Sequence, residues 1–101
     1  MASILEQADQ IVNHRSEEKE RKYGPFAECN RRAAVIASIL ANKEITTRDI
    51  YYFQIALKLA RESHAHGRDN LLDAAAYIGA LDNYEEGIEP NPVDSNLEDL
   101  Q

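Results

Sequence analysis

The fold is decided by residues 46–84, which read TTRDIYYFQIALKLARESHAHGRDNLLDAAAYIGALDNY. Thr46 and Asp49 have the spacing of a capping box, which predicts a helix from this point to about Ser63. Apolar residues lie on two sides of it, Ile50, Phe53, Leu57 and Ala60 on one and Tyr52, Ile55 and Leu59 on the other. This pattern predicts the most buried helix of the protein.

A second helix of the pair is expected from about Asp69 to Tyr84, after a helix-stop signal at Gly67. It is expected to bury Leu71, Ala75 and Ile78. Residues 74–76 and 79–80 are alanine and glycine, which permit close approach of another helix, from the same chain or from another copy.

Two more helices are predicted upstream. Ser3 and Glu6 form a capping box, and the stripe that follows contains Ile4, Leu5, Ala8, Ile11 and Val12. The next helix is expected over 25–41, with an apolar stripe of Phe26, Cys29, Ala33, Ile36 and Leu40, so that Cys29 is read as a buried thiol. The charged residues 15–22 form either a loop or a solvated continuation of the first helix.

These elements predict an all-α protein, a small helical bundle of about four helices over residues 1–87, followed by an acidic tail at 88–101 that is disordered or loosely docked. A chain of 101 residues buries a limited core. We therefore expect a homo-oligomer, most simply a dimer.

Charge is divided unevenly along the chain. Residues 85–101 hold six acids and no base, so the net charge of −7 leaves the body nearly neutral. This argues against duplex DNA as a partner, because Lys and Arg supply most non-specific affinity for it. A single cysteine, no signal-peptide pattern and no long apolar run predict no membrane association and a cytoplasmic location.

Polar residues on the two central helices suggest a ligand site. Asp69, Asp73 and Tyr77 share one helix face, where paired carboxylates can orient ligand hydroxyls or hold a cation. The simpler interpretation is that Asp69 caps the helix and Asp73 faces solvent. Gln54, Lys58 and Arg61 share a stripe with Tyr51, and the Lys and Arg can bind phosphate together unless the stripe is solvated. We expect Lys58, Arg61, Asp69, Asp73 and Tyr77 to converge on one pocket.

Other signals are weaker. His64 and His66 lie in a turn without a third metal ligand placed by spacing, so no role is assigned to them. No phosphate-binding glycine loop, nucleophile elbow or H-E-x-x-H motif occurs in the sequence.

Over residues 4–82 the chain resembles a family of small uncharacterised proteins of phages and prophages. The matching positions are Arg21-x-Tyr23-Gly24, Glu28, Asn30, Ile45-Thr46-x-x-Asp49, Lys58-x-Ala60-Arg61 and Arg68-Asp69-x-Leu71-x-Asp73-x-x-x-Tyr77.

The helix order is more distantly similar to the MazG-like nucleoside triphosphate pyrophosphohydrolases, whose E-x-x-E and E-x-x-D motifs hold magnesium. Glu17 and Glu20 have the first spacing, whereas Asp69 and Asp73 are four residues apart instead of three. The resemblance implies a magnesium site of Glu28, Asp69 and Asp73 if the protein is such an enzyme.

Three functions follow. The first is a non-enzymatic phage protein, without a cofactor, that binds or sequesters a nucleotide or nucleotide-derived signal in a pocket built by helices and oligomerisation. Its candidate ligand-binding residues are Tyr23, Asn30, Gln54, Lys58, Arg61, Asp69, Asp73 and Tyr77. The alternatives are a Mg-dependent MazG-like pyrophosphohydrolase and an interaction protein that engages a host factor through its acidic tail.

Overall fold

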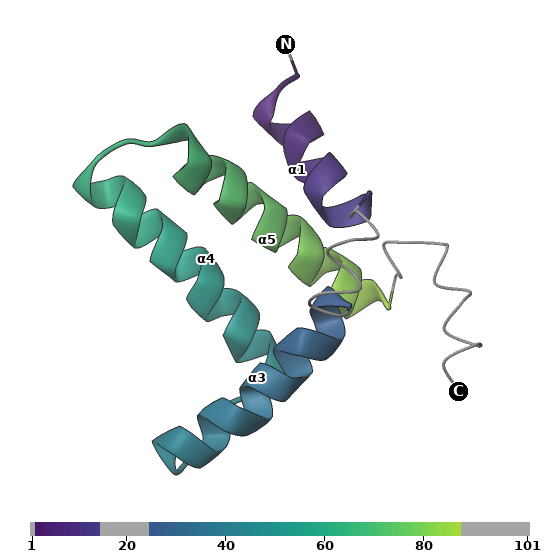
Figure 1. Cartoon of the computed structure of the whole chain (residues 1–101), viewed down its shortest axis with the longest axis vertical. Helices are drawn as coiled ribbons and strands as arrows, with labels where there is room; N and C mark the ends of the chain where they lie inside the picture. Colours follow the sequence, from purple (N-terminus) through teal and green to yellow (C-terminus); the bar gives the residue numbers. More distant parts are fainter. Residues whose placement is uncertain (1, 15–24, 88–101) are drawn as a thin grey trace.

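The computed structural model describes residues 2–14 and 25–87, and four helices lie in these two ranges (Figure 1). They are α1 (Ile4–Asn13), α3 (Phe26–Ala41), α4 (Thr47–His64) and α5 (Arg68–Glu86). The predicted all-α fold is confirmed, and each predicted boundary lies within two residues of the observed one. The charged segment 15–22 and the acidic tail 88–101 lie outside the described residues.

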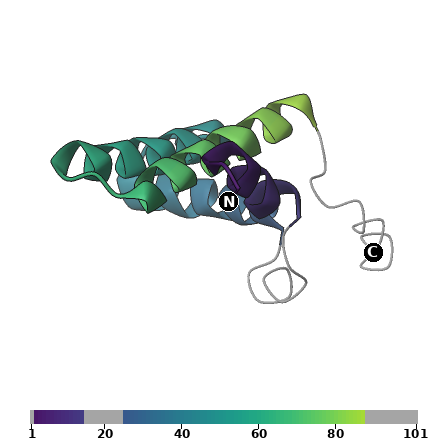
Figure 2. The same ribbon diagram turned by 90° about the horizontal axis from the view of Figure 1, so that it is seen from above.

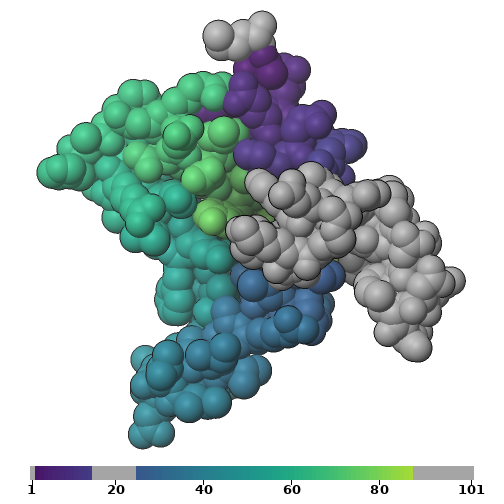
Figure 3. Space-filling view, in the orientation of Figure 1, coloured from purple at the N-terminus to yellow at the C-terminus, as the bar shows by residue number. Residues whose placement is uncertain are grey.

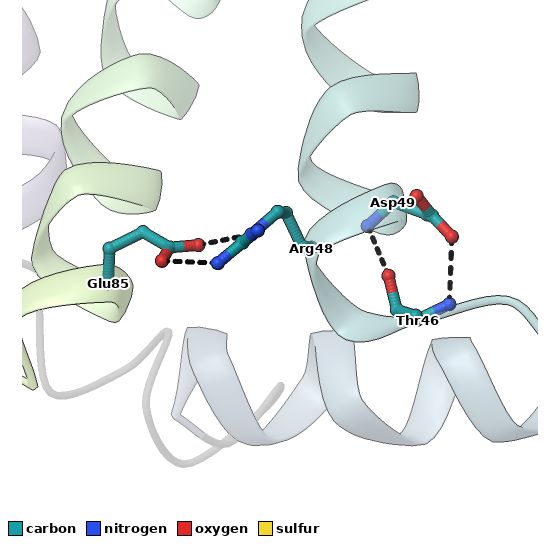
Figure 4. Close-up of polar contacts among 4 residues, drawn as sticks. All are labelled: Thr46, Arg48, Asp49 and Glu85. Atoms are coloured by element: carbon teal, nitrogen blue, oxygen red, sulfur yellow. Dashed lines mark hydrogen bonds and ion pairs between the residues drawn. The ribbon is translucent and has the colours of Figure 1, made fainter.

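Both predicted capping boxes are present. The Ser3 hydroxyl accepts a hydrogen bond from the Glu6 N–H at 3.1 Å, and the Thr46 hydroxyl accepts one from the Asp49 N–H, also at 3.1 Å. The Asp49 carboxylate in turn accepts from the Thr46 N–H at 2.9 Å (Figure 4). These hydrogen bonds stabilise the ionised carboxylate and lower the pKa of Asp49. Local sequence alone therefore sets the start of α1 and α4.

Helices α4 and α5 form an antiparallel hairpin that is fastened at both ends. At the open end the Arg48 guanidinium donates two hydrogen bonds of 2.6 Å to the Glu85 carboxylate (Figure 4). At the turn, the Glu62 carboxylate accepts from the Gly67 N–H at 2.9 Å. Gly67 has an extended backbone with φ −145° and caps the start of α5, so its predicted role as the stop of the preceding helix is corrected.

The small residues of α5 are used within the chain. Helix α5 lies between α4 and α1 (Figures 1 and 2), and its buried residues are Ala74, Ala76 and Ala80. A Cβ at Gly79 would meet the Val12 side chain of α1 at 3.8 Å, which is ordinary contact distance. The prediction that Ile78 is buried is wrong, because this side chain points away from both neighbours and is 54% exposed.

Helix α1 runs in the same direction as α5 (Figure 1). Arg68 at the start of α5 donates to the Gln7 side chain at 2.7 Å, and Asn83 near its end donates to the Asn13 side chain at 2.9 Å. Polar contacts at the edges therefore fix the direction of this short helix.

Helix α3 crosses one end of the hairpin, and its C-terminal half projects beyond it (Figures 1 and 2). The residues of α3 that are buried are Asn30 and Ala34. The predicted apolar stripe is wrong: Cys29, Ile36 and Leu40 are exposed, so Cys29 is not a buried thiol. Because α3 crosses the hairpin, the other helices that the structure describes cover mainly its first half, while Ser38 in the second half bonds the Ile45 backbone.

Helix α4 is not the most buried element, contrary to its sequence pattern. Its buried residues are Ile50 and Tyr51 alone, whereas Tyr52, Phe53, Leu57 and Leu59 are about half exposed. Its inward side contacts α5 and α3, and nothing in the described part of the chain covers the other side. Of the helices described, none is long and apolar enough to cross a membrane.

Candidate functional site

The inward side of α4 carries polar residues that meet partners on two other helices. Gln54 and Lys58 are one turn apart on α4, Asn30 lies on α3 and Asp73 on α5. We call these four residues the polar seam. Tyr51 lies one turn before Gln54, toward the start of α4.

Lys58 and Asp73 form an ion pair across the hairpin, with 3.0 Å between Lys58 Nζ and Asp73 Oδ2. Their side chains are 18% and 39% exposed. The two predicted polar stripes therefore come together here, because the short turn at residues 65–67 makes α4 and α5 antiparallel neighbours. The positive charge of Lys58 is therefore already balanced by the Asp73 carboxylate in this structure.

Asn30 is the most unusual polar residue of the described chain, because its side chain is only 2% exposed. Its Oδ1 accepts a long hydrogen bond of 3.5 Å from Gln54 Nε2. Asn30 Nδ2 and Gln54 Oε1 are buried and make no hydrogen bond of good geometry among the described residues; the Asn30 amide does lie against the Tyr51 hydroxyl, where it opposes the rise that burial causes in the pKa of that hydroxyl. A buried polar atom without a partner costs about 1–3 kcal/mol, so this amide pair has a donor and an acceptor available for another molecule.

Aromatic rings surround the amide pair. The Phe26 ring is edge-on to Tyr51 at 5.8 Å and stacked with Tyr77 at 5.9 Å, and Tyr84 lies 5.3 Å from Tyr51. Burial raises the pKa of Tyr51, and the neighbouring Asn30 amide opposes that rise. Tyr51 is 1% exposed, so this ring belongs to the core instead of offering a free stacking face.

Several predicted residues lie apart from the seam. Arg61 and Asp69 are exposed, and their side chains make no hydrogen bond or ion pair with other described residues. Tyr77 packs on Phe26 instead of pointing at Lys58. Tyr23 lies outside the described residues. Of the five residues expected to share one pocket, Lys58 and Asp73 are therefore in contact with each other. The other two residues of the seam, Asn30 and Gln54, are among the predicted ligand-binding residues but lie outside that group of five.

The three residues implied as magnesium ligands are not brought together. Glu28 pairs with Arg31 at 3.4 Å and with Arg32 at 3.8 Å on its own helix, and Asp73 pairs with Lys58. Across residues 2–14 and 25–87, no three His, Cys, Asp or Glu side chains are placed to hold a metal ion.

The turn between α4 and α5 contains a contact that spacing did not single out. The His66 ring lies 2.5 Å from the Glu62 carboxylate, which also accepts from the Gly67 N–H. These two interactions lower the pKa of Glu62, the backbone hydrogen bond more than the ring. The i,i+4 spacing of Glu62 and His66 was the available signal, and it indicates a structural role for this histidine.

A shallow hollow is found elsewhere. It lies at the far end of α3, lined by Ser38, Ile39 and residues 42–44, and no predicted site residue lines it.

The fold and the seam define a small all-α domain with a polar junction between three helices. The chain belongs to a family described as a domain of unknown function (DUF6378), whose model matches residues 3–85. It is 33% identical over 92 residues to the "Gene 55 protein" of Mycobacterium phage D29, a match that covers 89% of this chain and 59% of that protein. The chain thus spans about three fifths of the length of this relative. No solved structure matches the chain. The predicted resemblance to an uncharacterised phage family is confirmed.

Proposed function

We propose that this protein binds, and by binding sequesters, a nucleotide or nucleotide-derived signal at the polar seam, in the cytoplasm of a bacterial host. The observation that carries the proposal is the buried amide pair, since Asn30 Nδ2 and Gln54 Oε1 are a donor and an acceptor that make no hydrogen bond of good geometry within residues 2–14 and 25–87. A protein gains stability when a ligand supplies those two hydrogen bonds.

The chemistry of the seam fits the two ends of a nucleotide. A nucleobase edge presents hydrogen-bond acceptors beside donors, which matches an amide N–H beside an amide oxygen. Lys58 follows Gln54 by one helical turn, a rise of about 6 Å, and supplies a positive charge for a phosphate. Neighbouring aromatic rings keep the base end apolar.

Asp73 sets a condition on binding. Its carboxylate already pairs with Lys58 at 3.0 Å, so an incoming phosphate must displace it. We infer that Asp73 weakens the binding of simple anions and favours ligands that also satisfy the amide pair. This selects nucleotides over free phosphate.

The MazG-like pyrophosphohydrolase remains an alternative proposal, supported by Asp69 and Asp73 on one face of α5 and by the resemblance in helix order. Host-factor binding through the acidic tail is a third, and it concerns residues outside those described.

The experiment is a search for small molecules released from the purified protein by denaturation, followed by calorimetric titration with nucleotides, with and without Mg²⁺. We expect binding without pyrophosphate release. Lys58→Met should weaken binding at least about 10-fold, the effect of one lost charge-assisted hydrogen bond, because such bonds contribute about 1.5–3 kcal/mol.

The matched control is Lys43→Met, which removes an exposed lysine from the turn after α3 and should leave affinity unchanged. Pyrophosphate release that requires Mg²⁺ would support the hydrolase alternative. No bound molecule, together with no heat of binding for any nucleotide, contradicts the proposal.

A further inference from the structure

Two apolar surfaces of the described chain have no partner within it. The outer face of α4 consists of Tyr52, Phe53, Leu57 and Leu59, which are 48–55% exposed, with the exposed Ala56 and Ala60 between them. The α3 arm consists of the projecting C-terminal half of α3, where Val35, Ile36, Ile39 and Leu40 are 57–81% exposed. Neither surface takes part in the polar seam.

The outer face of α4 has the form of a helix-docking surface. At 3.6 residues per turn, its six residues cover a continuous arc of about 160°; no charged side chain lies on this arc between Tyr52 and Ala60, and Asp49 bounds it at the start of the helix. The two alanines run along the middle of the arc, with large side chains on either side. A second helix can therefore approach closely along the middle and be gripped by the flanks.

The α3 arm stands at an angle to this face. Figure 3 shows it projecting from the body, with a re-entrant outline between the arm and α4. In this half Ser38 hydrogen-bonds the Ile45 backbone, but the four large apolar side chains stay mostly exposed and gain little from burial. The α3 arm and α4 therefore border the same open space, which a docked partner could fill.

The interior of the single chain is too small to account for this arrangement. Seven hydrophobic residues are buried among those described, and five of them are alanine. Eleven of the described large apolar side chains are exposed, and others, such as Ile55 and Leu71, are only part-buried. Because stability depends on buried apolar area, folding itself requires that these surfaces be covered. A covering partner must then be present whenever the protein is made, and a second copy of the chain meets that requirement.

The area agrees with this choice of partner. At about 200 Å² for a large apolar residue, the eight exposed side chains offer on the order of 1,000 Å² per copy, against about 800 Å² per partner in a stable interface. We propose that two copies associate through the outer faces of α4 and the α3 arms, so that each copy covers the apolar surface of the other. This inference is independent of the proposed ligand, because the seam lies on the opposite side of α4.

Sedimentation equilibrium on the full chain, over a range of concentrations, tests the proposal. We expect twice the 11.4 kDa mass of one chain and a thermal midpoint that rises with concentration. Leu57→Glu should raise the dissociation constant at least about 30-fold, the loss typical of an interface hot spot. Leu5→Glu is the matched control, because it places the same charge on an exposed leucine of α1, and it should leave the mass at two chains.

The wild-type measurements keep the proposal open to refutation even if Leu57→Glu fails to fold. A wild-type chain that stays monomeric at 100 µM overturns it. So does a dimer that Leu57→Glu leaves unchanged, because its interface then lies elsewhere. A monomer that begins to associate after deletion of residues 88–101 also overturns it, because the tail then covers these surfaces.

Discussion

The two faces of α4 depart from the usual pattern of a helix in a small domain. The face packed inside the chain carries Gln54 and Lys58 beside the buried Ile50 and Tyr51, whereas the face toward solvent carries Phe53 and Leu57. Helix α5 shows the ordinary arrangement, with alanines buried and its acidic Asp82 exposed. Polar groups held inside a small core are costly, so they indicate a use, and large apolar groups held outside indicate a missing neighbour. On this ground we propose that the inner face of α4 binds a ligand and that its outer face contacts a second copy.

The largest effect is expected where the inner face of α4 meets the aromatic cluster. Tyr51→Ala should lower the free energy of unfolding by about 3–5 kcal/mol, as truncation of a large buried aromatic usually does. Urea denaturation followed by circular dichroism measures it. Tyr51→Phe keeps the ring and removes only the contact of the hydroxyl with the Asn30 amide, so it should cost less than about 1.5 kcal/mol. A loss below 1 kcal/mol for the alanine variant contradicts the placement of this ring in the core.

Asn30→Leu separates stability from function. The substitution removes one unpaired buried atom but also the acceptor of the long Gln54 hydrogen bond, so the unfolding free energy should change by no more than about 1 kcal/mol, while nucleotide binding is lost. Denaturation and calorimetry on the same sample give both values. Should the variant lose stability and keep its affinity, Asn30 is a structural residue and the seam is not the binding site.

Asp73→Asn should change affinity in the direction opposite to Lys58→Met. It removes the carboxylate that occupies Lys58, so an anionic ligand should bind about 3–10-fold more tightly, while stability falls by no more than about 1 kcal/mol. Titration at two salt concentrations measures both the gain and its electrostatic origin. Weaker binding in this variant shows that Asp73 contacts the ligand directly.

The smallest effect concerns the ends of the hairpin and depends on pH. The pKa of Glu62 is lowered in the folded chain from its ordinary value of 4.5, so its contribution is present above that pH and is lost as the pH falls through the lowered pKa. Asp49, lowered from 3.8, behaves in the same way at more acidic pH. Glu62→Gln should flatten the thermal midpoint between about pH 5 and 3. Glu86→Gln, at the exposed end of α5, is the control and should keep the wild-type profile.

Some of this architecture could be predicted from sequence because it is local. Capping boxes at Ser3 and Thr46 fix helix starts through contacts three residues apart. The meeting of Lys58 and Asp73 could also be predicted, since a three-residue turn leaves two long helices little choice but to lie side by side.

Other features depend on packing that spacing does not encode. The crossing of α3 decides that Asn30 is buried and Ile36 is exposed, and no periodicity within α3 contains that angle. Apolar periodicity predicts buried residues on both sides of α4, but Phe53, Leu57 and Leu59 are about half exposed, because periodicity does not say which neighbour covers a face. For that reason the prediction of a deeply buried α4 is wrong for the single chain.

Native mass spectrometry of the protein as purified from a phage-infected or nucleotide-rich host tests the two faces of α4 together. We expect the wild-type protein to give ions of two chains that carry a bound small molecule. Asn30→Leu should give ions of two chains without that molecule, and Leu57→Glu should give ions of single chains. Wild-type ions of one chain with nothing bound, under conditions that preserve a known weak dimer, would contradict it.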